Sequence, residues 1–248
     1  MKKILLMSLL AALLSACATY EQLPIAGQVI DAESGEPIAG AVVVGDWALE
    51  GGWYESVRVG TFERQEVVTN DNGEFVLPGW KPRSRPSGIN APYIPDHEPR
   101  IVAYRYGYLP VREFNNNGWK DKDSGILEWS GKEKISLTKL PEDYRARYEL
   151  FSDKGGLAGG LLPPLFRNCT WKTNNLLLLE YDKQEYEFEI RVLEDIEGAP
   201  VIPWFSRALH RNQYVNKDYS INCPGVIEFL TSQRKKREMS DLKNKNAE

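Results

Sequence analysis

The sequence predicts a β-sandwich over residues 25–140, followed by a smaller, mostly helical region over residues 141–232. Two observations support this prediction. Short segments of alternating or β-branched apolar residues recur up to Leu140, and turns rich in glycine, asparagine and proline separate them. Beyond Leu140 the apolar residues recur at helical spacing instead. A chain of 248 residues, 42% of them hydrophobic, is long enough to bury a core of this kind.

The first strands are marked by their turns. Strands are expected at 28–31 and 41–44, with a turn at 34–37 that contains Gly35 and Pro37. A hairpin is expected next, because the run 70–73 offers residues that accept positive φ between Val68 and the alternating Phe75 and Leu77.

Alternating segments that begin at Arg100 and at Glu133 supply the remaining strands. The predicted connections 46–63, 79–99 and 113–131 are long, and loops of this length are usually functional or disordered. Disorder is disfavoured because these connections are rich in aromatic residues. They hold five of the seven tryptophans, namely Trp47, Trp53, Trp80, Trp119 and Trp129.

One pattern of glycines and apolar residues resembles a known family. It runs from Gly27, Val29 and Asp31 through Gly35, Pro37, Gly40, Ala41 and Val43 to Thr69, Gly73, Phe75 and Leu77, and ends at Tyr106, Gly107 and Tyr108. The pattern resembles the carboxypeptidase regulatory-like domain and covers roughly residues 25–140. The resemblance implies a transthyretin-like, seven-stranded sandwich. The matching positions are ones that shape turns or fill a core, so they carry little chemistry.

The C-terminal region is expected to begin with a short helix, since Pro141 is followed by acidic residues and the glycine pair 155–156 ends the segment. Residues 172–196 fit helical spacing but also alternate in part, so a helix is favoured and a strand stays open. The tail 233–248 has too few apolar residues to order itself and is expected to be disordered.

The N-terminus indicates export. Lys2 and Lys3 precede a short apolar run that is too short to remain as a membrane-spanning helix. The stretch 14–17, Leu-Ser-Ala-Cys, resembles the bacterial lipobox, which implies that residues 1–16 are removed and that Cys17 carries the lipid anchor. An ordinary secretory signal ending near Ala16 or Ala18 is the alternative. Residues 17–24 would then be a lipidated tether, and Ala18 after the cysteine implies the outer membrane of a bacterial envelope, facing the periplasm.

The other two cysteines, Cys169 and Cys223, would lie in a compartment that permits disulfides. We expect them to pair, with a stabilisation of roughly 4 kcal/mol in the chain-entropy model. Two buried free thiols are the alternative.

The composition and motifs argue against several function classes. A formal charge of −4 disfavours nucleic acid as a partner. The two histidines, His97 and His210, lack the spacing of a zinc carboxypeptidase site, so the stretch 96–98 is interpreted as a solvated loop and no metal is expected. There is no Gly-x-Ser-x-Gly elbow and no phosphate-binding loop, so no catalytic residue and no cofactor are expected.

The expected function is therefore that of a membrane-anchored envelope lipoprotein acting as a non-enzymatic interaction or structural module. Loop tryptophans are the candidate contacts to an envelope protein or a glycan, namely Trp53, Trp80 and Trp119. The alternative for these residues is packing in small satellite cores. A carbohydrate-binding accessory and an enzyme with an unrecognised site are the competing functions.

Overall fold

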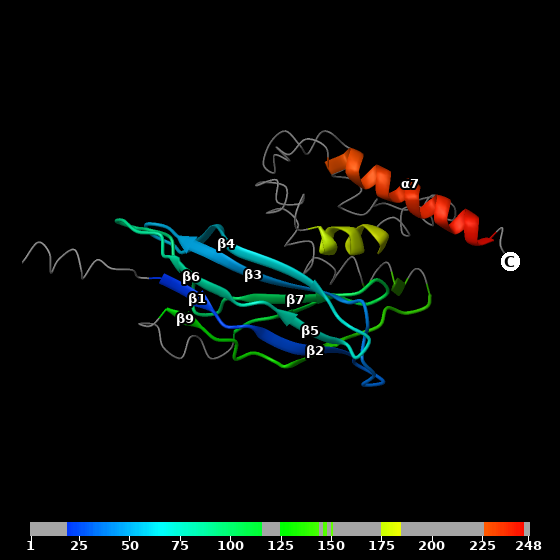
Figure 1. The fold of residues 1–248 in the computed structure, drawn as a ribbon, viewed down its shortest axis with the longest axis horizontal. Coiled ribbons are helices and arrows are strands. Elements are labelled where there is room, and N and C mark those ends of the chain that lie inside the picture. Colours follow the sequence, from blue (N-terminus) through cyan, green and yellow to red (C-terminus); the bar gives the residue numbers. More distant parts are fainter. Residues whose placement is uncertain are drawn as a thin grey trace, which may run out of the picture.

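The structure, a computed structural model, describes residues 19–115, 125–143, 146–147, 150, 175–184 and 226–245. Over these residues the chain is rich in β-sheet and has a small helical region (Figure 1). The strands are β1 (Thr19–Gln22), β2 (Ile25–Asp31), β3 (Val42–Gly51), β4 (Val57–Val68), β5 (Glu74–Leu77), β6 (Trp80–Ser84), β7 (Arg100–Tyr104), β8 (Val111–Glu113), β9 (Ile126–Leu127) and β10 (Lys134–Leu137). The helical residues include a segment at 176–184 and α7 (Val226–Lys245).

The strands form three sheets. Their orders are β6-β1-β9, β10-β2-β5 and β4-β3-β7-β8. In the first two sheets the central strand has one antiparallel and one parallel neighbour, whereas all pairs of the third are antiparallel. The longest pair, β3 with β4, extends from Val42 opposite Val68 to Gly51 opposite Val57.

Both predicted early turns are present, but neither joins two paired strands. β2 and β3 flank the turn at 34–37 and lie in different sheets, as do β4 and β5 on either side of the turn at 70–73. The expected hairpin across 70–73 is therefore wrong in its pairing. Local turn chemistry selects the turn, whereas the choice of partner strand depends on which apolar faces must meet in the core.

Side chains at the turns explain why the chain reverses there. The carboxylate of Asp31 accepts hydrogen bonds from the backbone N–H groups of Glu33 and Ser34 at 2.8 and 3.0 Å. These bonds lower the pKa of Asp31. Gly73 has a φ of 70°, and a Cβ at this position would lie 2.5 Å from the carbonyl oxygen of Val29, so glycine is required there.

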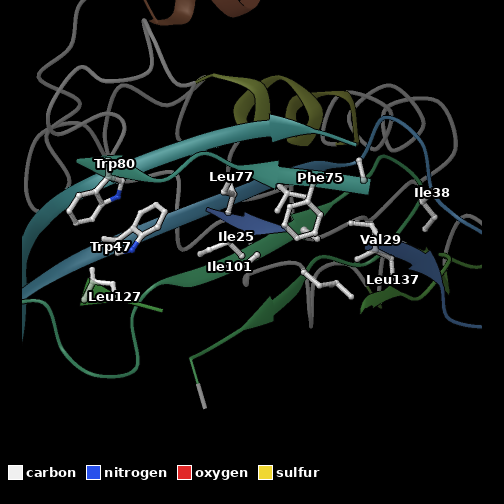
Figure 2. Packing of buried hydrophobic residues seen from close by; sticks show 14 of the residues in the cluster. Ile25, Val29, Ile38, Trp47, Phe75, Leu77, Trp80, Ile101, Leu127 and Leu137 are labelled. Atoms are coloured by element: carbon white, nitrogen blue, oxygen red, sulfur yellow. The ribbon is translucent and has the colours of Figure 1, made fainter. Parts of the chain in front are cut away.

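One hydrophobic core lies between the sheets. Alternate residues of β2, β5 and β10 face alternate residues of β3 and β7, and β1, β6 and β9 extend the same core (Figure 2). Its members include Ile25, Val29, Val43, Trp47, Phe75, Leu77, Trp80, Ile101, Ala103, Leu127, Ile135 and Leu137. The predicted core residues Val43, Phe75 and Leu77 are all in this set.

The other face of the β4-β3-β7-β8 sheet is also buried. Val44 and Val102 alternate along β3 and β7 with residues of the core, so they point to the opposite face of the sheet. Both are nevertheless 0% exposed. The helix at 176–184 covers part of this face (Figure 1), with the rings of Tyr181 and Tyr104 6.0 Å apart. Leu178 of the same helix is fully buried.

Polar contacts hold this helix to the sheet region. At its first turn, the Glu66 carboxylate accepts a hydrogen bond from the backbone N–H of Leu176 at 2.7 Å, where a negative charge is favourable. Farther along, Glu180 accepts from the backbone N–H of Tyr106 at 2.9 Å, and Gln184 accepts from Gly107 at 3.2 Å. The prediction of a helix within 172–196 agrees with the helix at 176–184.

Two segments differ from the sequence prediction. Thr19–Gln22, expected in the tether 17–24, form β1, the central strand of its sheet. Residues 233–245 of the expected disordered tail belong to α7. In α7, Arg234 and Arg237 both form ion pairs with Asp182, whose side chain is buried, and these pairs connect this helix to the segment 176–184.

Candidate interaction site

The end of the β3–β4 hairpin exposes a group of large apolar side chains. We call Trp53, Tyr54, Val57, Val59 and Tyr93 the aromatic tip. Trp53 is 75% exposed and Tyr54 98% exposed. The connection 46–63, expected to be a long loop, is thus a hairpin whose strands continue to Gly51 and Val57 and whose turn carries both rings.

Hydrogen bonds brace the base of the aromatic tip. Glu50 and Tyr93 form a β-bridge through two backbone hydrogen bonds of 2.8 and 2.9 Å. The Ser56 hydroxyl donates to the Glu50 carboxylate at 2.9 Å and lies 3.1 Å from the Tyr93 hydroxyl. Gly52 allows the tight turn, because a Cβ there would lie 2.1 Å from the carbonyl oxygen of Glu55. The two exposed rings therefore project from an ordered base.

The predicted ligand-binding tryptophans have different surroundings. Trp53 is on the surface, whereas Trp80 is 6% exposed and lies in the hydrophobic core. Trp119 lies outside the described residues, as do the predicted lipidation site Cys17 and the predicted disulfide pair Cys169 and Cys223.

The core position of Trp80 explains why it is unsuitable as a surface contact. Its ring meets the ring of Trp47 edge-on at 6.1 Å (Figure 2). The ring of Phe62 lies 5.4 Å from that of Trp80. The indole N–H of Trp47 donates to the side-chain oxygen of Gln22 at 2.8 Å. Packing, the alternative weighed for the loop tryptophans, is therefore the role of Trp80 and Trp47, and Trp80 is no longer a ligand-binding candidate.

A group of charged side chains lies on the outer face of the β4-β3-β7-β8 sheet. We call Asp46, Arg58, Glu98, Arg100 and Arg112 the charge cluster. Arg58 lies 2.8 Å from the Asp46 carboxylate, and Arg100 donates to the Glu98 carboxylate at 2.8 Å. Both carboxylates are 0% exposed.

Burial changes the acid–base properties of the charge cluster. It raises the pKa of Glu98 to about 7, with a smaller rise from Asp46, although Arg100 opposes this shift. Burial, together with repulsion by Arg100 and Arg58, lowers the pKa of Arg112. Glu98 therefore changes its charge within the physiological pH range.

The interpretation of residues 96–98 as a solvated loop is wrong for Glu98. His97 is exposed, and its Nε2 lies 3.6 Å from the Glu50 carboxylate and 3.8 Å from the Glu98 carboxylate.

Within the described part of the chain, no group of three or more His, Cys, Asp or Glu residues could hold a metal ion. In the same residues, no helix is long and apolar enough to cross a membrane.

Sequence reasoning did not identify the charge cluster, because its members are distant in sequence and meet only through strand pairing. The register places Asp46 opposite Arg100 and Val102 opposite Arg112. The available signal was a single aspartate inside the β-branched run of β3, since charge in a buried strand requires a partner.

Comparisons with known proteins give little guidance. No family model and no curated protein matches the chain. Among solved structures, the chain is similar to 3-chlorocatechol 1,2-dioxygenase from Rhodococcus opacus 1CP, with a TM-score of 0.29 and 18% identity. The match covers 51% of this chain and 63% of the dioxygenase chain, so it spans less than two thirds of that protein. A TM-score of 0.29 is too low to assign a shared fold or activity.

Proposed function

We propose that this chain is an exported, lipid-anchored envelope protein that acts as a non-enzymatic interaction module, with the aromatic tip as its contact surface. The observation that carries this proposal is the exposure of Trp53 and Tyr54 on a braced hairpin. Burial of a large aromatic ring against a partner contributes strongly to binding, and Trp and Tyr are enriched among the residues that dominate the binding energy of interfaces.

The anchor is supported by the sequence and by the position of β1. Cys17 follows a short apolar run, and Leu-Ser-Ala-Cys has the composition of a lipobox. β1 begins at Thr19, two residues after the proposed lipid. Two or more acyl chains hold a protein on a bilayer far more firmly than one.

We further propose that the sheets form the transthyretin-like sandwich implied by the resemblance. The sharing of one core by β2, β5 and β10 on one side and β3 and β7 on the other supports this arrangement. In such a fold the strands supply a rigid frame, and a hairpin that extends from it can present side chains to a partner.

The pairing within the charge cluster supports a non-enzymatic role. A catalytic carboxylate must reach a substrate, but Asp46 and Glu98 are buried and interact with arginines of the same sheet or its border. Buried ion pairs of this kind commonly fix one arrangement of the surrounding strands.

A photo-crosslinker at Tyr54 in living cells tests the contact surface, and the matched control is the same group at Val76, which is 57% exposed on β5. Adducts with lipid, glycan or protein are expected at position 54 and not at position 76. Equal yields at both positions would contradict the assignment of the contact surface.

The lipid anchor is tested separately by membrane fractionation. The Cys17→Ser protein is expected to be lost from the membrane fraction, and unchanged fractionation would contradict the anchor.

A further inference from the structure

We propose that the aromatic tip docks on the lipid surface to which Cys17 is attached, so that the chain contacts the membrane at two points. This inference rests on the proposed lipid anchor and names the partner of the aromatic tip. Four observations support it: the place where β1 begins, the length of chain before β1, the side chains of the aromatic tip, and the distribution of charge along the strands.

The start of β1 lies at the same end of the sheets as the aromatic tip. The side chain of Arg85 donates to the carbonyl oxygen of Thr19 at 2.9 Å. The hydroxyl of Tyr20 accepts a hydrogen bond of 3.3 Å from the backbone N–H of Ile94. Ile94 follows Tyr93, which forms the β-bridge with Glu50 at the base of the tip. In Figure 1 the beginning of β1 and the end of β3 lie at the same end of the molecule.

The chain before β1 is too short to hold the tip far from the lipid. Cys17 precedes Thr19 by two residues, which span at most about 7 Å when extended. Trp53 follows Glu50 by three residues, which span at most about 10 Å. These two lengths are similar, so the rings can reach the headgroups of the same bilayer, and the anchor keeps them at a high effective concentration there.

The side chains of the tip suit a membrane interface. Trp and Tyr concentrate at the headgroup level, where the ring meets apolar chains and its polar atom meets water. Val57 and Val59, 50% and 56% exposed, extend the apolar surface along β4. Glu55 is also exposed in the turn, which favours a position among the headgroups over insertion into hydrocarbon.

Charge along the strands favours the same orientation. Lys81 is exposed on β6, the strand paired with β1, whereas Arg83 on the same strand forms an ion pair with Glu63 at 2.5 Å. The turns that follow β2 and β4 lie at the opposite end of the strands (Figure 1). Glu33, Glu36 and Asp71 are exposed in these turns. An anionic membrane attracts Lys81 and repels the three acidic residues of the turns.

The test uses the lipidated chain in vesicles of phosphatidylethanolamine and phosphatidylglycerol. Tyr54→Cys reports on the tip, and Glu33→Cys is the matched control at the far end. A membrane-impermeant maleimide labels each cysteine, and peptide mass spectrometry reads labelling at that position alone. Relative to the Cys17→Ser chain in solution, labelling at position 54 is expected to slow by at least about tenfold, and labelling at position 33 to stay unchanged.

Vesicle flotation separates the two ways in which the proposal can fail. If the chain does not float with vesicles, the anchor itself is wrong. If it floats but position 54 labels as fast as in solution, the anchor stands and the docking is overturned. Protection of position 54 that requires added envelope protein or glycan would also overturn it, because the partner would then not be lipid.

Discussion

Glu98 makes the stability of the fold depend on pH in a direction that can be calculated. Its pKa is about 7 in the folded chain and 4.5 without burial, so the folded state binds the proton more tightly. A raised pKa contributes stability that is fully present below pH 4.5 and is lost as pH rises through about 7. Raising the pH from 5 to 8 is therefore expected to lower the free energy of unfolding by about 2 to 3 kcal/mol through this one carboxyl.

Glu98→Gln removes the titration and keeps the shape of the protonated side chain. The variant is expected to match the parent near pH 5 and to be more stable than the parent by about 2 to 3 kcal/mol at pH 8. Urea unfolding at the two pH values measures both. Glu133→Gln, at an exposed position, is the matched control and should leave the pH dependence unchanged. If Glu98→Gln retains the parent's pH dependence between pH 5 and pH 8, the reasoning is refuted.

Three other expectations follow from burial and pairing. Trp47→Ala should lower the free energy of unfolding in urea by about 3 to 5 kcal/mol, whereas Trp53→Ala should change it by less than about 0.5 kcal/mol. Similar losses for the two variants would contradict the assignment of Trp47 to the core and of Trp53 to the surface. Asp182→Asn should speed hydrogen exchange in α7, because its two arginines lose their shared carboxylate, and unchanged exchange would argue against that contact. Cys169 and Cys223 should resist alkylation until reduced, and two free thiols in the non-reduced protein would contradict the predicted bridge.

The strands were predictable from sequence largely where the local pattern determines them. The alternation of Phe75 and Leu77 and the turn glycine Gly73 identify β5 and the turn before it. Which strand pairs with β5 was not predictable, because pairing depends on contacts distant in sequence. β1 was missed for the same reason, since the four residues Thr19–Gln22 form a strand only by pairing with β6 and β9.

The candidate site was predictable only in part. Trp53 and Trp80 look alike in sequence, as tryptophans beside glycine, yet one is 75% exposed and the other 6% exposed. The difference arises because Trp80 begins β6 and points at Trp47, whereas Trp53 lies in a turn beyond the core. Burial of Glu98 was also hidden, because its partners come from the paired strands β3 and β7.

The most direct test of the account is the mass of the N-terminal peptide of the protein extracted from membranes. The mature chain is expected to begin at Cys17 and to carry a diacylglyceryl group on this residue, which would place the lipid two residues before β1. A mature chain that begins at Thr19, or one that begins at an unmodified Cys17, would contradict the lipid anchor.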